Sequence, residues 1–199
     1  MGKYNDQEND KYLLENNLLG VKTIEELEEA EAFAFSLRAA QLERTENVID
    51  SFTEEHFKKL HYHLFQDIYP FAGQFRDVQL MKGNTRFCQA QYISTYSSDL
   101  FNQLNKESMW NSLDEAANRL AYFKSELNML HPFREGNGRI IRIFIRAFAL
   151  SKGVQWEYEN IDRDVYIQAM IQSVTNTEAL KKLLLETLVS STNDHNSKE

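Results

Sequence analysis

The stretch His131-Pro-Phe-Arg-Glu-Gly-Asn-Gly-Arg-Ile-Ile-Arg142 combines an imidazole, a carboxylate, a Gly-Asn-Gly turn and two arginines. Apolar side chains follow the turn at three- and four-residue spacing, which indicates one buried face of an α-helix. Gly153, just beyond the last of them, is a typical stop signal. The stretch therefore predicts a loop that turns into a helix. The apolar positions are Ile140, Ile143, Phe144, Ala147 and Phe148.

The start of this predicted helix suits an anion. The first backbone N–H groups of a helix have no partner within it and carry the positive end of the helix dipole. Gly136 and Gly138 allow the backbone to approach a ligand closely, and successive N–H groups in such a turn form a concave anion site. Arg139 and Arg142 are three residues apart, so both can project from the first turn, where their planar guanidinium groups match phosphate oxygens.

Glu135 and His131 add chemistry to this anion site. A carboxylate beside a polyphosphate is repelled unless a cation lies between them, and Mg²⁺ binds one or two carboxylates together with phosphate oxygens. We therefore expect Glu135 to hold Mg²⁺. His131 has an ordinary pKa near 7, which makes it the candidate proton acceptor. Leu127, Met129 and Leu130 precede it, and the desolvation that they imply should lower its pKa and favour the neutral form.

The stretch resembles, at every specified position, the signature of the Fic family, His-Pro-Phe-x-(Asp/Glu)-Gly-Asn-Gly-Arg-x-x-Arg. Characterised members of that family transfer AMP from ATP to a hydroxyl of another protein. The resemblance implies a protein adenylyltransferase that uses ATP and Mg²⁺ and modifies a Tyr, Thr or Ser side chain. It also implies a role for each signature residue. His131 deprotonates the target hydroxyl, Phe133 anchors the loop in the core, and Glu135 binds Mg²⁺. Asn137 and the nearby amides of Gly136 and Gly138 hold the α-phosphate, and Arg139 and Arg142 bind the β- and γ-phosphates.

Composition limits the class of protein. The chain has 199 residues, enough for one domain with a substantial core, and 42% of them are hydrophobic. A formal net charge of −8 argues against a nucleic-acid partner and against an anionic membrane surface. The single cysteine, Cys88, excludes an internal disulfide. No apolar run reaches the roughly 18 residues of a membrane span, and the N-terminus lacks the apolar core of a secretory signal, so we expect a cytoplasmic protein.

Hydrophobic periodicity predicts a mostly α-helical, single-domain bundle. After an extended lead-in over residues 1–22, a capping box at Thr23 begins a helix that runs to about Glu43, and Phe33 and Leu37 are among the apolar residues that indicate it. Residues 191–199 are predicted to fray. Later helices are predicted from Ser51 or Thr53 to Pro70, from Ile93 to about Asn105, from Ser112 to Leu130, from the signature to Gly153, from Asp162 to about Val174, and from Thr177 to about Leu188.

Residues 71–93 form the one stretch with a strand-like pattern. Gly83 and Asn84 are a turn signal between apolar residues on either side, which predicts a β-hairpin. On these residues alone, a surface hairpin packed by its own aromatic side chains is the simplest interpretation.

The sequence of this hairpin also resembles that of the flap of Fic proteins, a segment that covers the active site and aligns the target. The matching motifs are Phe71-Ala-Gly-x-x-Arg76 and Lys82-Gly-Asn-x-x-Phe87. The resemblance implies that the target protein docks at about Arg76–Phe87, where strand addition to the hairpin edge is one way to bind an extended segment. It further implies that Lys82 and Gly83 meet the nucleotide.

Three histidines lie in the predicted helix that ends at Pro70. His61 and His63 are two residues apart and do not share a helical face, and no acidic or sulfur partner stands at a zinc spacing. We interpret both, together with His56, as ordinary surface or capping residues rather than metal ligands.

Many Fic proteins carry an inhibitory helix, (Ser/Thr)-x-x-x-Glu-(Gly/Asn), whose glutamate pairs with the second signature arginine, here Arg142. In this chain only Ser51 has a glutamate four residues on, Glu55, and His56 follows it instead of Gly or Asn. The resemblance therefore implies that a small separate antitoxin protein supplies an inhibitory glutamate against Arg142. The alternative is a protein without this regulation.

Two other functions fit the sequence less well. A protein of the same fold can use another nucleotide or transfer a phosphoryl group. The kinase-like branch of the family, however, departs from the Gly-Asn-Gly-Arg sequence that this chain retains. A non-catalytic nucleotide-binding module would have no use for His131, Glu135 and Arg139 together.

Overall fold

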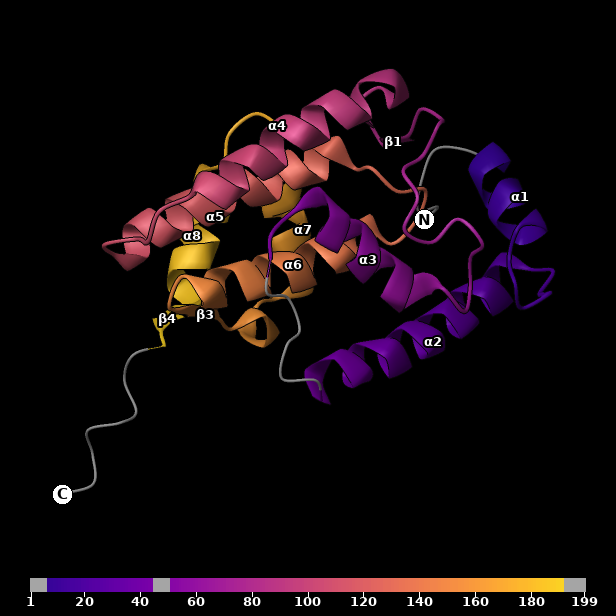
Figure 1. Cartoon of the computed structure of the whole chain (residues 1–199), viewed down its shortest axis with the longest axis horizontal. Helices are drawn as coiled ribbons and strands as arrows, with labels where there is room; N and C mark the ends of the chain where they lie inside the picture. Colours follow the sequence, from indigo (N-terminus) through magenta and orange to yellow (C-terminus); the bar gives the residue numbers. More distant parts are fainter. Residues whose placement is uncertain (1–6, 45–50, 192–199) are drawn as a thin grey trace.

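The computed structural model describes residues 7–44 and 51–191, which fold into α-helices with short strands in two places (Figure 1). The predicted mostly helical fold with a small hairpin before the signature is confirmed. The helices are α1 (Gln7–Glu15), α2 (Ile24–Arg44), α3 (Glu54–Phe65), α4 (Ile93–Lys106), α5 (Leu113–Leu130), α6 (Asn137–Ser151), α7 (Arg163–Gln172) and α8 (Glu178–Thr187).

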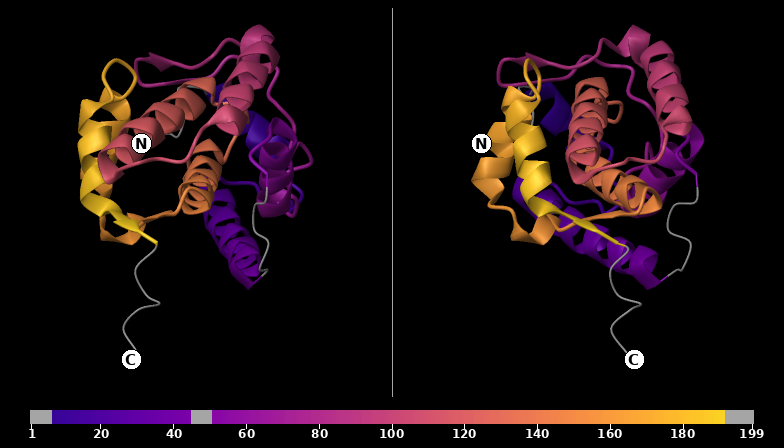
Figure 2. Two further views of the ribbon diagram at one scale, coloured as in Figure 1. Left: turned by 60° about the vertical axis from the view of Figure 1, so that its left-hand side comes forward. Right: turned by 90° about the vertical axis from the view of Figure 1, so that its left-hand side faces the viewer.

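Helices α5 and α6 form the centre of the fold. α5 packs against α4, α6 and α8, and α6 also contacts α3 (Figures 1 and 2). The rings of Phe123 in α5 and Phe148 in α6 meet edge to face with centroids 5.6 Å apart, and the rings of Phe144 in α6 and Phe57 in α3 lie 4.9 Å apart. Burial of each such side chain stabilises the fold by about 1.5–3 kcal/mol. The core therefore fixes the place where α5 ends and α6 begins.

Helix α2 runs along one side of the molecule and packs on α3 (Figure 1). Its fully buried residues are Leu27 and Glu31, whereas Phe33 and Leu37 are 74% and 53% exposed. The expectation that Phe33 and Leu37 help to bury this helix is therefore wrong. The carboxylate of Glu31 lies on the buried face of this helix, whereas the large apolar side chains of Phe33 and Leu37 lie on its exposed side. Apolar periodicity alone therefore assigns the wrong residues to the core.

The predicted extended lead-in is partly helical, because Gln7–Glu15 forms α1. Leu13 of this helix is buried, and a helix allows it to be buried while the backbone hydrogen bonds are satisfied locally. Of the tail predicted to fray over 191–199, residues 192–199 lie outside the described residues. The same is true of residues 1–6 of the lead-in and of residues 45–50 before α3.

Two antiparallel strand pairs complete the fold. The predicted hairpin consists of β1 (Met81–Lys82) and β2 (Thr85–Arg86), much shorter than the stretch 71–93, with Gly83 at φ 57° in its turn. A second pair was not predicted: β3 (Val154–Trp156) lies beside β4 (Leu188–Ser190), with Gln155 opposite Val189. This pair joins the segment after α6 to the end of α8.

Several predicted helix starts are confirmed by side-chain caps. Thr23 and Glu26 form the capping box, with the Glu26 N–H 3.2 Å from Thr23 Oγ1 and the Thr23 N–H 3.3 Å from Glu26 Oε2. Thr53, Ser112 and Asp162 cap α3, α5 and α7. One predicted helix end differs from the structure, because α3 ends at Phe65 and not at Pro70. Over the described residues, no helix combines the length and the apolar character needed to cross a membrane.

Candidate active site

The signature segment links the end of α5 to the start of α6. His131 follows α5 in the left-handed conformation, with φ 42° and ψ 57°, and is the one non-glycine residue with positive φ in the described part of the chain. This conformation ends the helix, while the His131 N–H still bonds to the carbonyl of Leu127 at 3.1 Å. Gly136 turns the chain again with φ 78°, and α6 begins at Asn137. The predicted turn from loop to helix is confirmed.

Phe133 and Asn137 hold this loop in shape. The Phe133 ring is fully buried and stacks on the His61 ring with centroids 3.8 Å apart. The buried side-chain amide of Asn137 closes the loop twice, because its Oδ1 accepts from the Phe133 N–H at 2.9 Å and its Nδ2 donates to the Phe133 carbonyl at 2.7 Å. Both ends of the amide are therefore engaged within the loop.

His61 supports the same loop from α3. Its Nδ1 accepts the Gly73 N–H at 2.9 Å, so Nε2 carries the proton and donates to the Glu135 carbonyl at 3.0 Å. Burial keeps the ring neutral by lowering the pKa of His61 to about 4. The interpretation of His61 as a surface or capping residue is therefore wrong, whereas His56, which bonds to Thr53 at the start of α3, fits it.

His131 has the protonation state of a proton acceptor. Its ring is buried and stacks on Phe87 of the hairpin segment with centroids 3.7 Å apart and planes 10° apart. Nδ1 lies 3.1 Å from the carbonyl of Asn128, and because a carbonyl can only accept, Nδ1 carries the proton and Nε2 the lone pair. Burial, assisted by the positive charges of Arg76 and Lys82, lowers the pKa of His131 to about 3. The imidazole is therefore neutral near pH 7.

Mild acid should destabilise the fold through these two histidines. An unfolded histidine takes up a proton near its ordinary pKa of 6.5, whereas folded His61 and His131 do so only near about 4 and about 3. Below pH 6.5 the unfolded chain therefore binds more protons, and stability falls as the pH falls. Between about pH 7 and about pH 5.5 we expect a loss on the order of 1 kcal/mol for each ring, measured as a lower midpoint of urea unfolding.

The variant His131→Ala provides the control for this pH effect. It retains His61 as the one buried imidazole of the pair, so its midpoint should fall about half as far over the same interval. Equal midpoints at the two pH values in the parent protein would contradict the burial of two neutral rings.

Arg76 fastens the hairpin segment to the end of α5. It is 4% exposed, and its guanidinium donates to the carbonyls of His131 (2.8 Å), Val78 (2.5 Å) and Cys88 (2.6 Å). Cys88 also donates its N–H to the carbonyl of Met129 at 2.9 Å. The arginine thus holds both sides of the hairpin against the histidine, and Lys82 and Gly83 lie at the hairpin's exposed end.

The first signature arginine, Arg139, lies in a cluster of charges with α2. Its Nη2 is 2.5 Å from Glu31 Oε1 and 3.3 Å from Glu135 Oε1. Tyr69 donates its hydroxyl to the other oxygen of Glu31 at 2.5 Å. The guanidinium also lies over the ring of Phe65, 4.9 Å from its centroid. Burial opposes the charged form, but the charges of Glu31 and Glu135 outweigh it and raise the pKa of Arg139.

The second signature arginine, Arg142, faces other partners. It donates to the Tyr158 hydroxyl at 3.0 Å and lies 4.5 Å from the centre of that ring. Lys124 of α5 is fully buried nearby, 5.0 Å from the centre of the Trp156 ring, and burial together with the charge of Arg142 lowers the pKa of Lys124 to about 7. Among the described residues no carboxylate lies within ion-pair distance of Arg142. The two signature arginines thus have separate surroundings.

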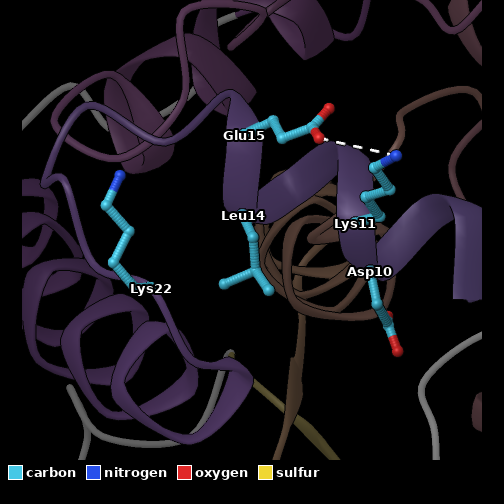
Figure 3. Close-up of a pocket in the computed structure, with 5 residues that line it drawn as sticks. All are labelled: Asp10, Lys11, Leu14, Glu15 and Lys22. Carbon is cyan, nitrogen blue, oxygen red and sulfur yellow. Dashed lines mark ion pairs between the residues drawn. The ribbon is translucent and has the colours of Figure 1, made fainter.

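A surface hollow of about 490 Å³ lies elsewhere, between α1 and the chain that leads into α2 (Figure 3). None of its lining residues belongs to the signature, and Lys11 and Glu15 pair with each other there at 3.7 Å. The lining residues are Asp10, Lys11, Leu14, Glu15 and Lys22.

The structure adds residues to the site that the sequence did not indicate. Glu31 touches the signature from α2 and His61 from α3, and Tyr69, in the chain after α3, bonds to Glu31. No three acidic, histidine or cysteine side chains of the described residues are grouped as a metal site, and Glu135 is the carboxylate of the signature loop itself. A hard carboxylate oxygen fits Mg²⁺, which completes its shell with phosphates and water.

Comparison with known proteins gives the same assignment as the signature. The sequence model of the Fic/DOC family matches residues 51–149. The protein adenylyltransferase VbhT of Bartonella schoenbuchensis is 38% identical over 172 residues, which cover 85% of this chain and 36% of VbhT. The Escherichia coli K12 protein named "Probable protein adenylyltransferase Fic" is 35% identical over 155 residues, covering 77% of this chain and 76% of that protein.

Crystal structures share the fold. The N-terminal Fic domain of a VirB-translocated Bep effector protein of Bartonella quintana, with bound ADP, superposes with a TM-score of 0.81 at 22% identity, over 88% of this chain and 91% of that one. BepC of Bartonella tribocorum, with bound AMPPNP, gives 0.78 at 22% identity, over 87% and 91%. With three quarters of the E. coli protein matched at 35% identity and the same fold in these structures, the chain belongs to the Fic/DOC family.

Proposed function

We propose that this protein is an adenylyltransferase that moves AMP from ATP to the side-chain hydroxyl of a target protein. The observation that supports it most is the state of His131, a neutral ring at the end of α5 that carries its proton on Nδ1. The target oxygen attacks the α-phosphorus, the bond from that phosphorus to the bridging oxygen breaks, and diphosphate leaves. The proton of the hydroxyl passes to Nε2 of His131.

The triphosphate lies against the first turn of α6. In the described chain the N–H groups of Asn137 and Gly138 make no backbone hydrogen bond, so both can donate to a phosphate. Asn137 contributes through this N–H and through the loop that its side chain closes, and Gly136 contributes the turn that presents the amides. Arg139, through its remaining nitrogens, and Arg142 bind the β- and γ-phosphates. The dipole of α6 and these charges stabilise the anion as the α-phosphorus becomes five-coordinate.

Glu135 holds Mg²⁺ beside these phosphates. When bound, the ion neutralises phosphate charge and helps diphosphate to leave. The chain's own contribution is to fix this carboxylate, which is 5% exposed and whose main chain is bonded to His61.

The target protein docks on the flap at about Arg76–Phe87. Arg76 fixes this segment relative to His131, so an extended target segment paired with the short hairpin would be aligned with the proton acceptor. Lys82 and Gly83 at the end of the hairpin contact the nucleotide. A separate antitoxin protein supplies an inhibitory glutamate to Arg142, which has a tyrosine rather than a carboxylate as its partner among the described residues.

Transfer of label from α-³²P-ATP to protein in a cell lysate tests the proposal. We expect Mg²⁺-dependent covalent labelling of a target, and mass spectrometry should find an adenylyl group on a Tyr, Thr or Ser hydroxyl. A phosphate on the target would instead indicate a phosphoryl transferase. Binding of the nucleotide without covalent labelling of any target would indicate a non-catalytic binding module and would contradict the proposal.

A further inference from the structure

Glu31 is a buried carboxylate that reaches the signature from outside it. It lies on α2, before the residues 51–149 that match the family, and is 1% exposed. One of its oxygens contacts Arg139 Nη2 at 2.5 Å and the other accepts the Tyr69 hydroxyl at 2.5 Å. Burial, together with the charge of Glu31, raises the pKa of that hydroxyl, so Tyr69 remains a donor. A charge placed this deeply requires such partners to remain ionised.

Arg139 stands between two carboxylates at unequal distances. Its Nη2 lies 2.5 Å from Glu31 but 3.3 Å from Glu135. Charge-assisted hydrogen bonds from a guanidinium to a carboxylate measure about 2.7–2.9 Å, so the contact with Glu31 is as close as a strong one, whereas the contact with Glu135 is longer than that range. Arg139 is therefore held mainly by Glu31, and Glu135 is left only weakly engaged by the guanidinium.

The ring contacts of Arg139 fix its plane as well. The guanidinium carbon lies 5.1 Å from the centre of the Phe35 ring and 4.9 Å from that of Phe65. Phe35 comes from the same helix as Glu31, so α2 provides both an ion-pair partner and an aromatic surface. The Nε and Nη1 groups of Arg139 make no hydrogen bond within the described residues and remain available as donors to phosphate.

We propose that Glu31 is a positioning residue for Mg²⁺ and nucleotide, which draws Arg139 away from Glu135 and so weakens the competition of the guanidinium with the metal for that carboxylate. Glu135 Oε1 also accepts the N–H of Gly136 at 2.8 Å, which holds the carboxylate in the loop. The proposal rests on the function proposed above. Without the charge of Glu31, Arg139 would pair fully with Glu135, and its positive charge would compete with Mg²⁺ for that carboxylate. With it, two carboxylates and one guanidinium leave an excess negative charge, which favours a divalent cation.

A glutamate beside a signature arginine could instead inhibit by occupying a phosphate position. Two observations favour positioning. Glu31 is bonded to Tyr69 as well as to Arg139 and is almost completely buried, so displacing it would strand a charge and a hydroxyl. Its partner is also Arg139 and not Arg142, which keeps its contact with Tyr158. The two roles predict opposite effects of removing the charge.

Binding of AMPPNP by titration calorimetry, with Mg²⁺ and with EDTA, tests the proposal. Glu31→Gln keeps the shape and removes the charge, so we expect affinity in Mg²⁺ to fall by about 10- to 100-fold, the usual effect of losing a residue that orients a metal ligand. Affinity in EDTA should change much less. Glu29→Gln, an exposed change of the same kind on the same helix, should leave both affinities unchanged.

The possible results separate the two proposals. Parent-like affinity of Glu31→Gln in Mg²⁺ would overturn the positioning role, and so would tighter binding or faster transfer, which would make Glu31 an inhibitor. Absence of AMPPNP binding by the parent protein would overturn the proposed function itself. Tyr69→Phe removes one hydrogen-bond donor from Glu31 without changing any charge. It should show a smaller loss of AMPPNP affinity, again only in the presence of Mg²⁺. This variant tests the positioning role if Glu31→Gln does not fold.

Discussion

Replacing His131 with alanine should abolish transfer of AMP while the protein still binds ATP. The ring is neutral and carries its proton on Nδ1, and loss of such a proton acceptor typically lowers a rate by about 10²- to 10⁴-fold. The phosphates are bound by other groups, namely the α6 amides, Arg139 and Arg142, so affinity for ATP should change little. Label transfer to the target at saturating Mg²⁺ and ATP, with calorimetry of ATP binding, measures both quantities.

A second histidine variant controls for the loss of an imidazole. His63 lies on α3 and faces the carbonyl of Arg38, away from the signature, so His63→Ala should transfer AMP at the parent rate. If His131→Ala keeps full activity, another group accepts the proton. If it loses ATP binding together with transfer, the ring serves mainly to shape the loop.

Replacing Gly136 with alanine should cost the protein a large part of its stability. The residue has φ 78°, and an added Cβ would lie 2.3 Å from Cζ and 2.5 Å from Cε2 of Phe65. The left-handed backbone and the overpacked contact together cost roughly 2–5 kcal/mol. Phe65 cannot easily retreat, because its fully buried ring stacks on His61 at 4.7 Å. Urea unfolding of the variant measures the loss.

Gly138→Ala is the matched control within the same turn. A Cβ at Gly138 would meet nothing within 4 Å, and the residue is helical, so the variant should be as stable as the parent or more stable by up to about 1 kcal/mol. Any loss of nucleotide affinity in a stable Gly138→Ala protein then reports close approach of the ligand. Equal stability of Gly136→Ala and the parent would contradict the packing of Phe65 against the loop.

The sequence predicted the part of the site that is contiguous in the chain. The helix start after the Gly-Asn-Gly turn and the neutral state of His131 follow from local pattern, and the structure agrees with both. The place of Phe133 in the core was implied by the family resemblance, and its ring is buried. These features depend on residues within a few positions of one another, where propensity and spacing are informative. Our assignment of the ligand roles stays a prediction.

The residues that the sequence missed act across long separations. Glu31 meets Arg139 from 108 positions away, and a polar residue in a helix gives no sign that it points inward. His61 did carry a usable signal, because it lies one turn after Phe57 and one before Phe65, on the buried stripe of α3. The strand pair β3–β4 was not predicted for a different reason: each strand is too short to show the two-residue alternation of apolar and polar side chains.

A crystal structure of the protein with Mg²⁺ and AMPPNP tests the central claim most directly. We predict that the triphosphate lies on the amides of Asn137 and Gly138, with Mg²⁺ on Glu135 and the α-phosphorus on the side of His131 Nε2. Nucleotide density elsewhere, for example in the surface hollow beside α1, with the α6 turn occupied only by water, would contradict it.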